Sequence, residues 1–140
     1  MRRTRPARLT VTLLAFMWMT AAACGGGGGG DEPAARPSST AQLAIVEPAN
    51  GTTLAGPTIP VQLSLEGAEL TDRVSTELRP DQGHLHVSLD GTLVEMNYQL
   101  DGELDNVAPG THVLRVEFVA LDHAPFTPRV FAEVSFEVQS

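Results

Sequence analysis

The strongest constraint on the fold is a two-residue period of apolar side chains, which recurs in short runs beyond about residue 42. Within 111–121, for example, Leu114, Val116 and Phe118 alternate with charged residues. Successive side chains of a β-strand point to opposite faces of its sheet, so this alternation predicts strands with one buried face. No segment of 42–139 has the clear spacing of an amphipathic helix, and we expect an all-β chain.

Turn residues divide this region into short strands. Asp90-Gly91 is the strongest hairpin signal, and Pro109-Gly110 marks another turn. About seven strands result, at 43–46, 59–65, 83–90, 93–100, 102–107, 111–121 and 130–138. Short strands at this spacing indicate an immunoglobulin-like β-sandwich over 42–140, with an open barrel as the alternative. The polar segment 67–82 lacks the alternation, so we expect a long loop or one helical turn there.

The aromatic residues indicate what fills the sandwich. Beyond residue 24 there is no tryptophan and no second cysteine, so the tryptophan-and-disulfide core of antibody domains is excluded. We expect an aromatic core instead, formed by Phe118, Phe126, Phe131, Phe136 and Tyr98.

The N-terminus is organised as an export signal. Four arginines within the first eight residues precede an apolar run from Leu9 to Met19, and three alanines then lead to Cys24. The run is short for a membrane span and is followed by small residues, as in a cleaved signal peptide. With a cysteine directly after the small residues, the segment resembles a bacterial lipoprotein signal. The resemblance implies that residues 1–23 are removed and that Cys24 is lipidated; an ordinary secretory signal is the alternative.

Residues 24–41 are expected to form a flexible tether between the lipid and the domain. Six glycines, Gly25 to Gly30, precede a stretch rich in proline, alanine and serine. Such segments bury too little apolar surface to offset the entropy of ordering. A phosphate-binding glycine loop is excluded, because no strand precedes the glycines and no Lys-Ser/Thr pair follows them. The lipid would anchor the domain to a bacterial membrane, facing outside the cytoplasm in the cell envelope.

Charge narrows the range of partners. The chain has nine basic residues, all arginine, and 17 acidic residues, for a formal net charge of −8. Every acid follows residue 30, so removal of the leader would leave five arginines against 17 acids, a formal charge of −12. Nucleic-acid binding depends on clustered cations that replace counterions, so nucleic acid is not an expected partner.

The inventory of reactive side chains argues against an enzyme. A single cysteine excludes an internal disulfide, zinc sites built on several thiolates, and cysteine-ligated iron–sulfur clusters. There is no Gly-x-Ser-x-Gly elbow, and a lipid on Cys24 would remove the thiolate that a blue-copper site needs. We find no complete catalytic constellation and expect no catalytic activity.

The histidines are the strongest candidates for chemistry. His84 and His86 are two residues apart on the expected strand 83–90, so they share one face. Leu85 and Val87 occupy the other face, which has the character of core. We therefore expect the two histidines on the outer surface of the sheet.

Strand pairing would extend this pair into a larger cluster. If 83–90 pairs antiparallel with 111–121, then Asp122 and His123 come to lie beside the two histidines. Three imidazoles and a carboxylate suit copper(II) or zinc. The candidate metal site is His84, His86, His123 and Asp122, and solvated surface histidines are the alternative interpretation. His112 lies at the opposite end of 111–121, where we expect it to hydrogen-bond loop backbone at a structural corner.

Several of these segments recur in one order, and together they carry a resemblance. The segments are Pro48-Ala-Asn-Gly51, Gly83-His-Leu-His-Val-Ser-Leu-Asp90, Leu104 through Leu114 with its Pro109-Gly-Thr-His112, and Asp122-His-Ala-Pro125. Their order resembles an exported bacterial immunoglobulin-like family of unknown function, whose members carry a Gly-His-His-His strand, then Pro-Gly-x-His, then a late Asp/Asn-His. Here Leu85 replaces the middle histidine. The resemblance implies a fold and a periplasmic or surface location, but no activity.

These observations favour a membrane-anchored binding or interaction module without catalysis. Its partner would be another envelope protein that meets an edge strand or the 67–82 loop. The alternative is a copper- or zinc-binding domain that uses the histidines of 83–90 and of the 122–125 loop.

Overall fold

The computed structural model describes residues 35–139; the predicted leader, Cys24 and most of the predicted tether lie outside the described residues. The described residues form nine strands: β1 (Gln42–Glu47), β2 (Thr53–Ala55), β3 (Ile59–Glu66), β4 (Glu69–Leu70), β5 (Gln82–Leu89), β6 (Thr92–Asn97), β7 (Asp101–Leu104), β8 (Gly110–Ala120) and β9 (Pro125–Gln139). All seven expected strands are present. The two additional strands, β2 and β4, are too short to show an alternation in the sequence. The described part of the chain contains no helix that is long and apolar enough to cross a membrane.

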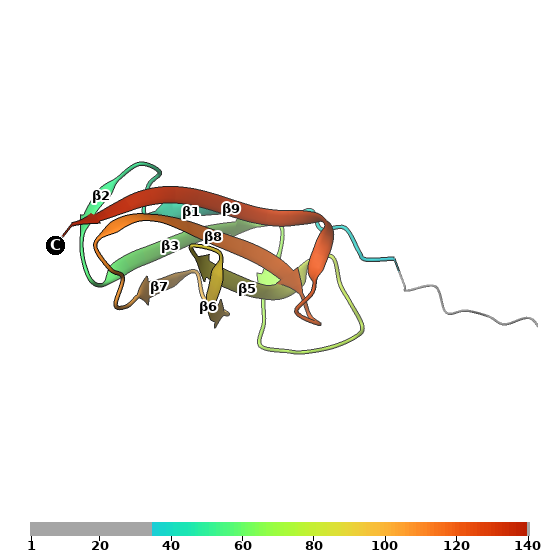
Figure 1. The fold of residues 1–140 in the computed structure, drawn as a ribbon. Helices are drawn as coiled ribbons and strands as arrows, with labels where there is room; N and C mark the ends of the chain where they lie inside the picture. Colours follow the sequence, from blue (N-terminus) through green and yellow to red (C-terminus); the bar gives the residue numbers. More distant parts are fainter. Residues whose placement is uncertain (1–34, 140) are drawn as a thin grey trace, which may run out of the picture. The chain divides into compact units, whose positions relative to one another are not determined.

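The strands form two sheets that pack face to face (Figure 1). One sheet has the order β1-β3-β7, and the other has the order β2-β9-β8-β5, with β4 and β6 both paired to β5. The chain changes sheet between β1 and β2, between β2 and β3, and between β3 and β4, and it does so again between β6 and β7 and between β7 and β8. This exchange, with consecutive strands divided between the sheets, is that of an immunoglobulin-like sandwich. The expected fold class is confirmed.

The core lies between the sheets, where the alternation predicted it. Leu114, Val116 and Phe118 of β8 are fully buried, and Ile59 and Val61 of β3 face them from the other sheet. Burial of each such side chain contributes about 1.5–3 kcal/mol. The apolar faces of the strands are therefore what holds the two sheets together.

Two of the five expected core aromatics are not buried. Phe118, Phe126 and Phe136 are buried, and the rings of Phe118 and Phe126 stack at 5.3 Å between centroids. Phe131 and Tyr98 keep 47% and 41% of their surface exposed. Phe131 follows Val130 on β9 and so lies on the outer face, where the guanidinium of Arg115 sits 3.7 Å from the ring centroid.

The folded unit begins earlier than the sequence indicated. Residues 35–41 belong to the predicted tether, but they contact the sandwich. The backbone N–H of Thr127 donates to the carbonyl of Pro37 at 3.0 Å, and Ala41 is buried in the core. The Arg36 side chain reaches the start of β9, where its Nε donates to the carbonyl of Pro125 at 3.0 Å. The tether expected from low apolar content therefore ends before these contacts.

Candidate functional site

Antiparallel pairing of β5 with β8 builds the histidine cluster. His84 lies opposite Val119 and His86 opposite Glu117. The turn after β8 then returns His123, whose φ is 61° and whose backbone N–H donates to the carbonyl of Ala120 at 2.9 Å. The rings of His84 and His123 stack at 4.3 Å between centroids, and those of His86 and His123 at 5.6 Å. The three imidazoles thus lie together at one end of the outer face of the sheet.

His84 lies on the outer face of the sheet, as expected, but it is buried there, unlike the solvated surface histidine of the alternative interpretation. The loop after β4 covers this part of the sheet, and His84 has no exposed surface. Its Nδ1–H donates to the carbonyl of Thr71 at 2.6 Å, and Nε2 lies 3.4 Å from the carbonyl of Leu121. The ring of Tyr98 approaches edge-on, with 5.4 Å between centroids. Both nitrogens face backbone oxygens, so His84 joins the loop to the sheet and is not free to bind an ion.

His86 and His123 form a half-buried pair. Nε2 of His86 and Nδ1 of His123 are 3.3 Å apart, within reach of one N–H···N hydrogen bond. Burial, and then the proximity of His123, lowers the pKa of His86. Neutral imidazole is therefore the favoured form of His86, and this is the form that donates one hydrogen bond, accepts another, or binds a metal.

The carboxylate of Glu117, which lies opposite His86 on β8, is already bound by an arginine. Glu117 is 7% exposed, and its Oε1 accepts a hydrogen bond of 2.7 Å from Nε of Arg129. A second guanidinium nitrogen binds the other oxygen, which makes the contact two-pronged and raises the pKa of Arg129. A buried carboxylate needs such a partner to offset its desolvation. Glu117 is thus bound to Arg129 and is not available to a ligand at His86.

Asp122 is likewise hydrogen-bonded within the chain. Nη2 of Arg36 donates to Oδ1 at 3.0 Å, and the backbone N–H of Ala124 donates to the same oxygen at 3.1 Å. The hydrogen bond from Arg36 lowers the pKa of Asp122. Within residues 35–139, no group of three or more histidine, cysteine or acidic side chains is arranged to hold a metal ion. Of the four ligands expected from the sequence, His84 and Asp122 are hydrogen-bonded to other parts of the chain.

His112 lies at the other end of β8 and contacts loop backbone. Its Nε2–H donates to the carbonyl of Ala108 at 2.8 Å, and Nδ1–H donates to Oδ2 of Asp90 at 2.7 Å. The other oxygen of Asp90 accepts the backbone N–H of Val113 at 2.8 Å. These hydrogen bonds raise the pKa of His112 and lower that of Asp90. The contacts join the β5–β6 turn to the start of β8.

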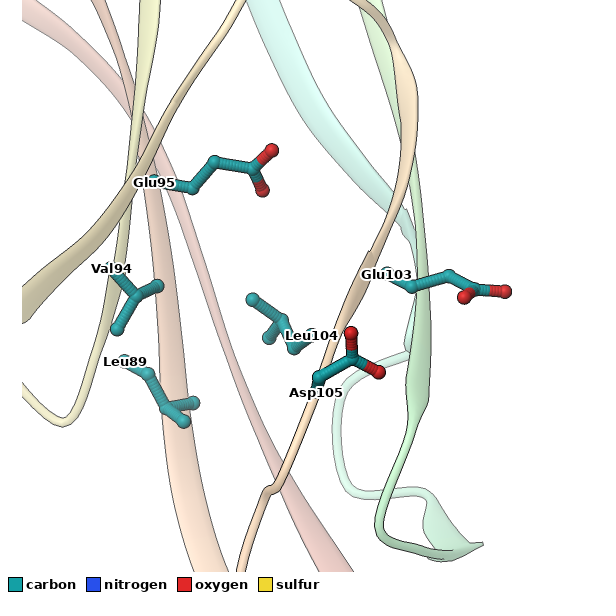
Figure 2. Close-up of a pocket in the computed structure, with 6 residues that line it drawn as sticks. All are labelled: Leu89, Val94, Glu95, Glu103, Leu104 and Asp105. Atoms are coloured by element: carbon teal, nitrogen blue, oxygen red, sulfur yellow. The ribbon is translucent and has the colours of Figure 1, made fainter.

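A second surface feature, the strand β6 and its surroundings, was not singled out by the sequence. All residues from Thr92 to Met96 are exposed. Next to it a hollow of about 290 Å³ opens between β6 and β7. Figure 2 shows the six residues that line it: Leu89, Val94, Glu95, Glu103, Leu104 and Asp105. The only sequence signal was the adjacent apolar pair Leu93-Val94, which breaks the alternation of the returning strand.

Comparison with known proteins gives likeness of shape alone. No known family and no curated protein sequence matches the chain. The fibronectin(III)-like modules of Clostridium thermocellum CbhA are 16% identical, with a TM-score of 0.49 over 69% of this chain and 94% of theirs. The PKD domain of human KIAA0319 is 11% identical, with a TM-score of 0.43 over 80% of this chain and 92% of its own. An engineered protein is 12% identical, with a TM-score of 0.48 over 71% of this chain and 20% of its own.

Proposed function

We propose that this chain is a lipid-anchored module of a bacterial cell envelope, facing outside the cytoplasm, whose domain binds another protein and has no catalytic activity of its own. One observation carries the proposal. Seven large apolar side chains of the described residues are exposed, and four of them, Leu93, Val94, Met96 and Tyr98, lie within six positions of one another. Leu93, Val94 and Met96 belong to β6, and Tyr98 directly follows its end. Isolated exposed apolar residues are common, whereas a contiguous group marks an interaction surface.

Site-specific photo-crosslinking in whole cells tests the binding function. A benzophenone amino acid is placed at Met96, and at Val46 and Val74 as controls of similar exposure elsewhere on the domain. A binding module gives a discrete protein adduct at one position and not at the others. The absence of a specific adduct at every position would overturn the proposal.

The anchor is supported by the leader pattern that ends at Cys24. Metabolic labelling with a fatty acid tests it, because Cys24→Ser removes the sulfur that would be acylated. The expected result is labelled wild-type protein and unlabelled variant, with the variant released or retained as precursor. Equal labelling of both would show that the chain is not a lipoprotein.

A second candidate function, copper or zinc binding, is favoured by the distance between His86 and His123. Two nitrogens at about 2.05 Å from one ion, with a tetrahedral angle between them, lie about 3.3 Å apart. Nε2 of His86 and Nδ1 of His123 are separated by 3.3 Å. Water or a partner's side chain would complete the coordination, since His84 and Asp122 are engaged within the chain.

Calorimetric titration with zinc and with copper(II) tests this second candidate. His86→Ala and His123→Ala should each abolish binding, whereas His112→Ala should not, since that side chain is bonded to Asp90 and Ala108 at the other end of β8. A dissociation constant weaker than about 0.1 mM for both ions, a binding free energy near −5.5 kcal/mol, would rule the site out.

A further inference from the structure

The outer edge of β6 is open among the described residues. β6 pairs antiparallel with β5 along one side, and no described strand pairs with its other side. Its tip is closed by the hairpin turn at Asp90-Gly91, where both residues have positive φ. An edge strand presents a row of unpaired N–H and C=O groups that can hydrogen-bond a further strand. Lysine, proline, bulges and inward-pointing charges block such pairing at many edges. The sequence Thr-Leu-Val-Glu-Met-Asn of β6 contains no lysine or proline, but its register with β5 shifts between Val87 and Ser88 and Glu95 lies on the inner side, so an added strand must accommodate that bulge and pair with that charge.

The register shows what an added strand would meet. Met96 lies opposite His86 and Leu93 opposite Ser88, so both share the outer face of the sheet. Glu95 lies opposite Val87, on the side of the core. Alternate side chains of an added strand would therefore contact two different environments. One set would pack beside Leu93 and Met96, and the other would extend over the hollow between β6 and β7.

The hollow combines an apolar floor with carboxylates. Figure 2 shows Glu95 extending from beside Val94 into the space above Leu104, with the carboxylate of Asp105 beside Leu104 and the side chain of Glu103 turned away. Leu104 is buried, and Oδ1 of Asp105 accepts a hydrogen bond from Thr58 at 3.0 Å. No basic residue is among those that line the hollow. A side chain with an apolar stem and a cationic head matches both parts of this surface.

We propose that β6 binds an extended segment of another protein as an additional strand, and that this segment alternates arginine or lysine with apolar residues. This inference rests on the proposed binding function and names the partner's chemistry. The basic side chains lie over the hollow, with their stems on Leu89 and Leu104 and their charges near Glu95 and Asp105. The apolar side chains cover Leu93 and Met96, while the main chain hydrogen-bonds the open edge.

Charge disfavours a second copy of this chain as the occupant. Antiparallel pairing of two β6 strands would bring two Glu95 side chains, and the two acidic hollows, to one interface. Like charges across a strand pair are destabilising. The mature chain would carry five arginines against 17 acids, so two copies also repel at longer range. The same negative field attracts a basic segment of another protein.

The test uses the mature chain from residue 24 with Cys24→Ser and a seven-residue peptide that alternates arginine and valine. Two control peptides separate strand addition from charge attraction. One replaces arginine with glutamate, and the other carries N-methyl groups on alternate amides at unchanged charge. Glu95→Arg is compared with Glu137→Arg, an exposed position on β9 that changes the net charge equally. Binding is followed by fluorescence anisotropy at 0.15 M salt, and amide hydrogen exchange locates it.

The arginine–valine peptide should slow amide exchange within 92–97, and N-methylation or Glu95→Arg should weaken its binding at least tenfold. Glu137→Arg should change the affinity less than threefold. Equal weakening by both arginine substitutions, or unchanged binding of the N-methylated peptide, would overturn the inference. Dimerisation of the chain alone through 92–97 in sedimentation experiments would do the same.

If Glu95→Arg does not fold, the test rests on the unsubstituted chain: slower amide exchange within 92–97 in the presence of the peptide supports strand addition, and unchanged exchange there overturns it. A crosslink at Val46 or Val74 without peptide protection of 92–97 would refute strand addition at β6 yet leave the proposed binding function standing.

Discussion

At the scale of single residues, Gly83 shows how closely β5 approaches β8. A Cβ built on Gly83 would lie 1.9 Å from the carbonyl oxygen of Val119 and 3.0 Å from the ring of Phe118. The obstacle at Val119 is backbone, which cannot move without disturbing the β5–β8 pairing. Only glycine fits here, next to the buried His84.

Gly83→Ala should therefore lower the free energy of unfolding by about 3 kcal/mol, the upper part of the usual range for overpacking. Gly102→Ala is the matched control, because a Cβ there would meet only Nδ2 of Asn97, at 3.4 Å. Urea denaturation of the two variants measures the difference. Similar losses for both would show that the two strands can separate at Gly83 without cost.

The pair of His112 and Asp90 should make stability depend on pH. The Asp90 carboxylate raises the pKa of His112, so the ion pair contributes fully below about pH 6.5, the unfolded value, and is lost as pH rises through the folded pKa. The pKa of Asp90 is lowered, chiefly by the hydrogen bond from Val113, so its contribution is present above about pH 3.9 and is lost as pH falls through the folded pKa.

The expected consequence is a melting temperature that falls between pH 5.5 and pH 8.5 more in the wild type than in His112→Gln. Differential scanning calorimetry at the two pH values measures the drop. Asp90→Asn should flatten the same interval, because the amide carries no charge to pair with the imidazolium. A drop of the same size in all three proteins would place the titrating group elsewhere.

At the scale of elements, His84 connects a loop to the sheet. Its Nδ1–H donates to the carbonyl of Thr71, and the backbone N–H of Ser75 donates to the carbonyl of Leu121 at 3.1 Å. The loop between β4 and β5 is otherwise short of regular structure. Without the imidazole, the carbonyl of Thr71 loses a buried donor, which costs about 1–3 kcal/mol.

His84→Leu should accordingly speed cleavage of this loop by trypsin. Arg73 is the accessible site, with 57% of its side chain exposed, whereas Arg79 is followed by a proline that protects the bond. His86→Leu is the control, since His86 contacts His123 and not the loop. Cleavage after Arg73 is followed by mass spectrometry over time. Equal rates in wild type and His84→Leu would mean that other contacts hold the loop.

The loop also explains which parts of the molecule could be predicted from sequence. Strand positions, the β5–β8 pairing and the gathering of His123 with His84 and His86 follow from local alternation and turn residues. The burial of His84 could not be predicted, because its cover is an irregular segment whose placement depends on contacts far apart in sequence. Phe131 was misplaced for a simpler reason: its residue type suggested core, whereas its neighbour Val130 already occupied that face.

The engagement of Asp122 was equally inaccessible to sequence reasoning. Its partner, Arg36, is 86 positions away, in a segment whose composition indicated a tether. A charged residue in a low-complexity stretch gives no sign of whether it reaches a fold. The open edge of β6 could be predicted only in part. The turn residues predict the hairpin, but they do not indicate which of its strands remains unpaired on its outer side.

At the scale of the whole molecule, the charge is far from balanced. The mature chain would hold five arginines against 17 acids. Four of those arginines pair with acids among the described residues, in Arg36–Asp122, Arg73–Glu77, Arg115–Glu133 and Arg129–Glu117. Most of the acids therefore add to a net negative field that opposes the compact state.

Added salt should consequently stabilise the mature Cys24→Ser chain. Between about 0.01 M and 1 M NaCl the Debye length falls from about 30 Å to about 3 Å, which removes most of the long-range repulsion. Salt also weakens the exposed ion pairs, but each contributes only about 0–1 kcal/mol. The melting temperature should therefore rise across this range, and Glu137→Gln, with one negative charge fewer, should show a smaller rise. A melting temperature that falls steadily with salt would show instead that the few ion pairs outweigh the repulsion among the remaining carboxylates.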